Sequence, residues 1–166
     1  MNIKTINIGN AQKTLEDLAM IKGKNYGNID IRISNLRLIK LNTLIGKNIF
    51  QKNDAYISAE TLWYVMQSEP GEGKHHHHGL TENDVLEGLK SISDPHLIIS
   101  TEQNRYLIVS LFISSFGLPL MIVIEIHSSL VTDLNANINK IVTLYPKDDI
   151  AGLIKKTPNN NLLYKK

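Results

Sequence analysis

Four consecutive histidines, His75 to His78, are the residues whose type and spacing point most directly to chemistry. Imidazole titrates near pH ~6.5, so a histidine held at the start of a following helix can act as a general acid or base. Imidazole also binds zinc, nickel and copper, although neighbours in one loop rarely all face one ion, and no HExxH motif accompanies the run. A solvated, tag-like surface run is the third interpretation, and the four residues alone do not decide among them.

A late apolar stretch, residues 138–145, carries the second candidate group. Its pattern predicts a strand, and Thr143 and Tyr145 are two residues apart, which places them on one face of that strand. Hydroxyls on a sheet face can hydrogen-bond a phosphate, and a tyrosine ring can stack on a base. The alternative is an ordinary β-branched strand residue followed by an aromatic at the edge of the core.

Two cations offer further contacts for an anion. Arg105 begins an expected central strand, where its guanidinium can bind a phosphate through two hydrogen bonds or remain a solvated strand end. Lys147 follows Pro146, at the expected start of the last helix, and backbone N–H groups there favour anions. Both residues are therefore candidates for substrate binding.

Composition removes several other classes of function. The chain has 166 residues with 18 Lys+Arg, 16 Asp+Glu and no Cys, a formal charge of +2. The absence of Cys excludes disulfides, thiol catalysis and thiolate metal sites, and the small charge argues against coating of duplex nucleic acid. No apolar run approaches the ~18–20 residues that span a bilayer, so we expect no membrane partner. The chain also lacks phosphate-loop and dinucleotide-binding motifs.

The elements expected in the N-terminal half are short. Apolar spacing predicts a helix over 11–22 and another over 59–66 with Ser58 as its N-cap. Alternation predicts a strand over 29–33 and a second strand over 37–44. Residues 67–79 contain a proline and three glycines without apolar periodicity, which indicates a loop or linker.

The C-terminal half has clearer elements. Thr81 and Asp84 have the spacing of a capping box for a helix over 82–91, which Asp94-Pro95 ends. The expected elements that follow are strands 97–100, 105–114, 120–127 and 138–145, a helix 148–156 and a strand 162–164. We therefore predict an α+β fold in which a helix packs on a small antiparallel meander sheet with a second short helix. Residues 1–73 would form an N-terminal α/β extension or small subdomain, and residues 74–166 the main domain.

The order of these pieces resembles a known nuclease family. His78-Gly79-Leu80 leads into the capped helix, two apolar strands flank 117–120, and a strand continues through 137–147 before the closing 162–164. This order is similar to the phage-associated branch of the barnase–EndoU–colicin E5/D–RelE-like (BECR) nucleases. Those domains occur at the C-terminus of MuF-type phage proteins and of polymorphic toxins. The resemblance covers roughly residues 74–166.

The resemblance implies metal-independent RNA cleavage without a cofactor. A base deprotonates the ribose 2′-OH, which attacks the adjacent phosphate, and an acid protonates the leaving 5′-oxygen, giving a 2′,3′-cyclic phosphate. RNA, including tRNA, would be the substrate, and an acidic immunity or antitoxin protein would be the partner of a toxin. The resemblance also implies a cytoplasmic site of action and delivery within a larger phage or toxin protein.

Carried over by position, His78 is the first choice for the acid or base, and Thr143 and Tyr145 bind the phosphate or a base. Substrate contacts extend to Arg105 and Lys147, and Tyr164, matching a terminal aromatic, either binds substrate or packs. His76 becomes a second catalytic histidine if its loop folds back. No second sure acid–base group can be matched. The alternative is therefore a catalytically inactive BECR-fold module that binds nucleic acid or a protein partner.

Overall fold

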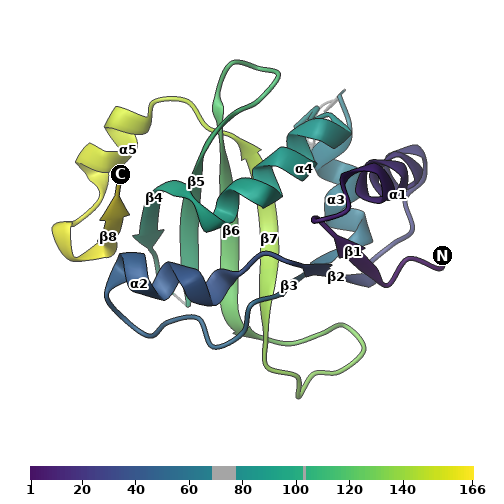
Figure 1. Cartoon of the computed structure of the whole chain (residues 1–166), viewed down its shortest axis with the longest axis horizontal. Helices are drawn as coiled ribbons and strands as arrows, with labels where there is room; N and C mark the ends of the chain where they lie inside the picture. Colours follow the sequence, from purple (N-terminus) through teal and green to yellow (C-terminus); the bar gives the residue numbers. More distant parts are fainter. Residues whose placement is uncertain (69–77, 103) are drawn as a thin grey trace.

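The computed structural model describes residues 1–68, 78–102 and 104–166 and contains one mixed sheet with helices on both faces (Figure 1). The strands follow the order β1-β2-β3-β7-β6-β5-β4-β8 across the sheet. The strands are β1 (Thr5–Asn7), β2 (Asp30–Ser34), β3 (Ala55–Ser58), β4 (Pro95–Ser100), β5 (Arg105–Ile113), β6 (Pro119–Ser128), β7 (Ile138–Pro146) and β8 (Leu162–Lys165). The helices are α1 (Ala11–Gly23), α2 (Leu41–Ile45), α3 (Ala59–Met66), α4 (Glu82–Lys90) and α5 (Ile150–Lys156).

The sheet extends well beyond the predicted meander. Strands β4 to β7 pair antiparallel in chain order, as expected for a meander, and β8 adds antiparallel to β4. The N-terminal strands continue the same sheet, because β3 lies parallel to β7 and carries β2 and β1 outside it. The α+β class is confirmed, but the expected small antiparallel sheet is only the middle of a mixed eight-stranded one.

The N-terminal extension and the remainder share one core. The main buried cluster includes Ile6 and Ile57 from the first half and Ile122 and Leu144 from the second. The expected boundary between residues 73 and 74 lies outside the described residues. A register that joins β3 to β7 through Tyr56 and Lys140 connects segments more than 80 residues apart, and no local sequence pattern encodes such a pairing.

One expected strand is wrong. Residues 37–44 form a 3₁₀ turn (Leu38–Lys40) followed by α2. Leu38 and Leu41 are both fully buried at a spacing of three residues, which one helical turn brings to the same side. Arg37 begins the turn in the left-handed region with φ of 59°. Burial of this leucine pair therefore favours a helical turn over the extended conformation that the alternation predicted for the same residues.

The two faces of the sheet are packed differently. Along β6, Leu120, Ile122 and Ile124 belong to the main cluster, which α1 to α4 cover. The alternating residues Met121 and Val123 face the opposite side, where α5 packs its apolar residues. Helix α4 crosses the sheet on the first face, whereas α5 lies at the end that carries β8 (Figure 1).

The caps of the two helices that border the site form as predicted. Ser58 accepts a hydrogen bond from the Thr61 N–H at the start of α3. Thr81 and Asp84 form a reciprocal capping box at the start of α4. The Ser58 cap fixes the N-terminal end of α3, and the capping box fixes the start of α4 directly after the return of the chain at residues 78–80.

Candidate functional site

The candidate site begins with His78, whose ring lies against the ring of Tyr145 on β7. The two ring centroids are 5.5 Å apart and the planes are inclined by 37°. The segment that carries the histidine is tied to the end of α3, because Gly79 N–H donates to the Gln67 carbonyl (2.7 Å) and Leu80 N–H to the Val65 carbonyl (3.0 Å). The backbone therefore holds this segment at the end of α3, and the imidazole meets the late strand at Tyr145.

Thr143 and Tyr145 share one face of β7. The register pairs Thr143 with Val123 and Tyr145 with Met121, and both partners on β6 belong to the same buried cluster. The prediction that these two side chains share a face is confirmed. His78, Thr143 and Tyr145 are thus gathered on one part of the molecule.

A β-bulge in β7 shapes the surface beside these residues. Thr143 pairs with Val123 and Ile141 pairs with Ile124, so that Val142 is the extra residue on its strand. A bulge of this kind bends the strand and redirects neighbouring side chains. As a result, the consecutive residues Val142 and Thr143 both reach one cavity.

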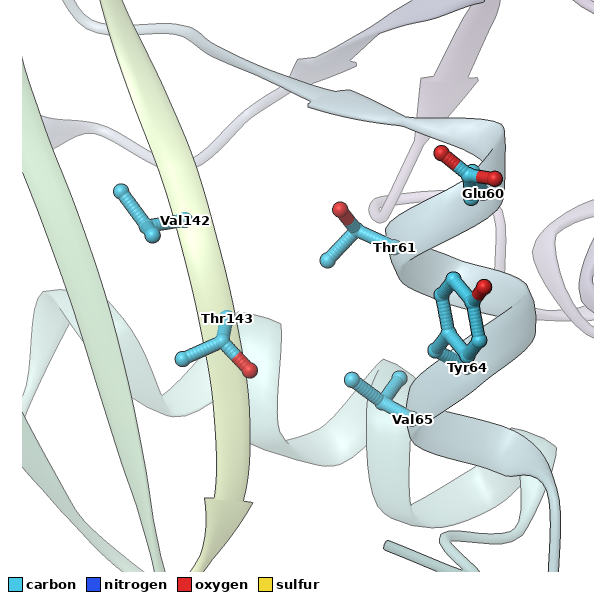
Figure 2. A pocket seen from close by; sticks show the side chains of 6 residues that line it. All are labelled: Glu60, Thr61, Tyr64, Val65, Val142 and Thr143. Carbon is cyan, nitrogen blue, oxygen red and sulfur yellow. The ribbon is translucent and has the colours of Figure 1, made fainter. Parts of the chain in front are cut away.

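This cavity lies between α3 and β7 and has a volume of about 210 Å³ (Figure 2). Thr61 and Val65 point from the helix toward β7, and the Thr143 hydroxyl is turned toward the helix (Figure 2). Within the described residues, neither the Thr143 hydroxyl nor the Glu60 carboxylate makes a side-chain hydrogen bond. The lining residues are Glu60, Thr61, Tyr64, Val65, Val142 and Thr143.

Burial controls the chemistry of Tyr145. Desolvation raises the pKa of its phenol above the ordinary value of 10.0, because burial disfavours the phenolate. The phenol is therefore neutral near pH 7 and can donate a hydrogen bond. It is unsuited to act as a general base there.

Lys147 lies two residues beyond Tyr145 at the same end of β7. Its backbone N–H donates to the Pro119 carbonyl (2.8 Å), and its side chain makes no ion pair within the described residues. Helix α5 starts only at Ile150, with Asp149 as its N-cap. The lysine thus precedes the helix, so its expected position at the helix start was wrong, but it remains a cation near Tyr145.

Arg105 and Tyr164 are not brought to this site. Arg105 donates from Nε to Glu125 Oε2 (2.9 Å), and the same register row continues to Lys140, at the opposite end of β7 from Tyr145. Tyr164 lies on β8, and strands β4, β5 and β6 stand between β8 and β7 in the sheet. Its side chain is partly buried against the main core. Their predicted substrate contacts would have to be made at other places on the sheet.

His76 lies outside the described residues, together with His75 and His77. The described part of the chain contains no group of three or more His, Cys, Asp or Glu residues that could hold a metal ion. No helix in that part is both long enough and apolar enough to cross a bilayer.

Sequence reasoning missed Glu60 and Tyr64. Both belong to α3, where only the apolar stripe was used to predict the helix. Glu60, Thr61 and Tyr64 lie on one side of that helix at spacings of one, three and four residues. This polar side is visible in the sequence, but the strand that it faces follows from the tertiary fold alone.

Comparisons of the chain with protein-family models, with curated proteins and with solved structures found no match. The functional assignment therefore rests on the residues and their geometry.

Proposed function

We propose that this chain is a metal-independent endoribonuclease of toxin-like or phage-associated type. The observation that carries the proposal is the contact between His78 and Tyr145, with Thr143 on the same strand face beside a cavity. A proton-transfer group, a neutral phenol and a hydroxyl thereby meet at one end of β7. One proton-transfer group and two hydrogen-bond donors are among the groups that cleavage of RNA by its own 2′-hydroxyl uses.

In the proposed reaction, the ribose 2′-OH loses its proton to a base and its oxygen attacks the adjacent phosphorus. The bond from phosphorus to the 5′-oxygen breaks, and an acid supplies the proton that this oxygen takes up. The products are a 2′,3′-cyclic phosphate and a free 5′-hydroxyl. His78 performs one of the two proton transfers, since imidazole exchanges protons near neutral pH.

Tyr145 and Lys147 serve the phosphate in this proposal, and Thr143 serves the part of the nucleotide that enters the cavity. The neutral phenol donates a hydrogen bond to a non-bridging oxygen of the phosphate, where negative charge grows as the new bond forms. The Thr143 hydroxyl lines the cavity and hydrogen-bonds the ribose or base that occupies it. Lys147 adds a positive charge at the same end of the strand. Residues 74–166 contain nine Lys+Arg and nine Asp+Glu, so this part of the chain has no excess of positive charge. A small number of positioned phosphate contacts is consistent with that charge balance.

Glu60 decides which part of the RNA enters the cavity. Its carboxylate lines the cavity and would repel a phosphate placed there. The phosphate therefore lies toward His78 and Lys147, and an uncharged part of the nucleotide, its ribose or base, occupies the space between α3 and β7. This gives the RNA strand one orientation relative to the histidine.

The test is cleavage of total RNA and of tRNA in the presence of EDTA, with analysis of the ends for a cyclic phosphate. We expect cleavage by the unaltered chain, its loss in His78→Ala, and a weaker effect in Thr143→Val, with Thr143→Ser as the variant that keeps the hydroxyl. His96→Ala, which changes a histidine on β4, is the matched control. A folded chain that leaves every RNA intact in EDTA would refute the nuclease.

The same experiment separates the rival function. A noncatalytic module that binds nucleic acid or a protein partner would hold RNA in a gel-shift assay without cutting it. His78→Ala would then change binding alone.

A further inference from the structure

Phe116 is an exposed aromatic residue beside the candidate site. It lies in the turn between β5 and β6, and 53% of its surface is exposed. Single exposed apolar residues are common on protein surfaces and need no explanation by themselves. Phe116 differs from such residues in its surroundings, because its ring reaches the backbone that carries His78.

The contact between the turn and the histidine segment depends on a glycine. Gly79 has φ of 66°, in the left-handed region, and a Cβ placed on it would lie 3.3 Å from Phe116 Cζ. The glycine therefore allows the backbone turn and a close approach of the ring tip. Since Gly79 directly follows His78, the aromatic ring lies against the backbone segment that carries the imidazole.

A buried carboxylate holds the turn in place. Asp84, at the start of α4, is only 2% exposed and accepts hydrogen bonds from the Ser115 N–H (2.9 Å) and the Ser115 hydroxyl (2.6 Å). The next residue is Phe116, whose own N–H donates to Ser114 Oγ (3.3 Å). The exposed ring is thus carried by a backbone whose position is set by specific bonds before any ligand arrives.

The same end of the sheet supplies a cation. Lys147 N–H donates to the carbonyl of Pro119, which starts β6 immediately after the turn. Within the part of the chain that the structure describes, the Lys147 side chain makes no ion pair. An aromatic ring and a cation at one end of a sheet are the two groups with which proteins hold single-stranded nucleic acid, the cation serving the backbone and the ring a base. A partner protein docking on the hairpin would need no such cation.

We propose that Phe116 is a stacking platform for a base of single-stranded RNA next to the nucleotide that occupies the cavity. This inference rests on the proposed function and adds a second nucleotide subsite to it. Stacking on a ring tolerates any base, because each base presents a π face. The platform therefore contributes to the affinity for RNA and to the direction in which the RNA strand lies, and it does not select a base sequence.

The experiment measures binding of a 2′-O-methyl RNA oligonucleotide, which lacks the attacking hydroxyl and stays intact. Fluorescence anisotropy gives the affinity, and a single 2-aminopurine moved along the strand reports stacking through quenching. Phe116→Ala should weaken binding between about fivefold and 150-fold, the range for loss of one stacked base, and should abolish quenching at one position. Phe116→Trp should retain both.

Two controls separate stacking from other effects. Ile113→Ala removes an exposed apolar side chain of the same hairpin, and Leu134→Ala removes one in the loop between β6 and β7, at the other end of β6. Both should bind as the unaltered chain does. Equal loss of oligonucleotide binding in Ile113→Ala would show that the apolar surface of the hairpin as a whole holds the RNA, and it would overturn the stacking role of Phe116.

The outcomes distinguish this inference from the proposed function. If the unaltered chain binds and quenches the oligonucleotide while Phe116→Ala does so equally well, the platform is refuted and the nuclease site stands. If the unaltered chain binds no oligonucleotide, both are refuted. Circular dichroism of each variant verifies that the fold is retained.

Discussion

The change Asp84→Asn should destabilise the protein by removing the bond between α4 and the β5–β6 turn. The carboxylate accepts three hydrogen bonds, two from Ser115 and one from the Thr81 N–H (3.1 Å). An amide of the same size offers one oxygen where the carboxylate offers two. At least one of the two backbone N–H groups therefore faces an NH₂ group and loses its acceptor.

The magnitude follows from the number and kind of these bonds. A hydrogen bond to a charged group contributes about 1.5–3 kcal/mol, and a buried donor left without a partner costs about 1–3 kcal/mol. With one bond lost and the charge removed from the others, we expect the free energy of unfolding to fall by about 2–4 kcal/mol. That is a large part of the stability of a single domain.

Acid should weaken the same interaction. Burial by itself raises the pKa of Asp84, but the hydrogen bonds from Ser115 and Thr81 outweigh it and hold the pKa below the ordinary 3.8. The stabilisation is fully present above the unfolded value and is lost as the pH falls through the lower folded value. The difference between the unaltered chain and Asp84→Asn should therefore be constant near pH 7 and shrink below about pH 4.

The assay is equilibrium unfolding in urea, followed by circular dichroism and by the fluorescence of Trp63, the single tryptophan. Asp148→Asn is the matched control, because that carboxylate is exposed and makes no side-chain hydrogen bond within the described residues. Its effect should stay within about 0.5 kcal/mol. The reasoning fails if Asp84→Asn is equally mild, or if its effect is the same at pH 3 as at pH 7.

Three further predictions concern the site and its surroundings. Gly79→Ala should lower the free energy of unfolding by about 1–2 kcal/mol, because alanine is strained in the left-handed region, and it should also lower RNA cleavage by displacing Phe116. Gly46→Ala, at φ of 75° in open space, is the control: it should show the same stability loss in urea without a change in cleavage. Tyr145→Phe should slow cleavage by about 3–10-fold, which corresponds to the loss of one hydrogen bond. The pH–rate profile up to pH 9 should stay unchanged, because burial keeps the phenol protonated there, and an altered alkaline limb would contradict this. Arg105→Ala should leave cleavage unchanged and alter the free energy of unfolding by less than about 1 kcal/mol, since it breaks only a half-exposed ion pair. A strong loss of cleavage would show that the substrate reaches the end of β5 that lies away from the candidate site.

The local elements could largely be predicted from the sequence. Periodicity located α1, α3, α4 and the strands β4 to β7 to within a few residues, and the Thr81–Asp84 spacing predicted the cap of α4. These features depend on neighbours within one or two turns of chain, so the residues that cause them are adjacent in the sequence. The same-face position of Thr143 and Tyr145 belongs to this group, because strand geometry alone produces it.

The candidate site depended on contacts that no local pattern contains. His78 meets Tyr145 because the return of the chain at 78–80 is bonded to the end of α3. Glu60 and Thr143 line one cavity because β3 pairs with β7 and α3 follows directly on β3. Both arrangements join segments separated by 65 or more residues, and the register of the strands is set by burial of the shared core. The sequence by itself determined which residues can transfer a proton or hold a phosphate, whereas the tertiary structure decided which of them meet. The histidine joined Thr143 and Tyr145, and Arg105 and Tyr164 were left elsewhere on the sheet.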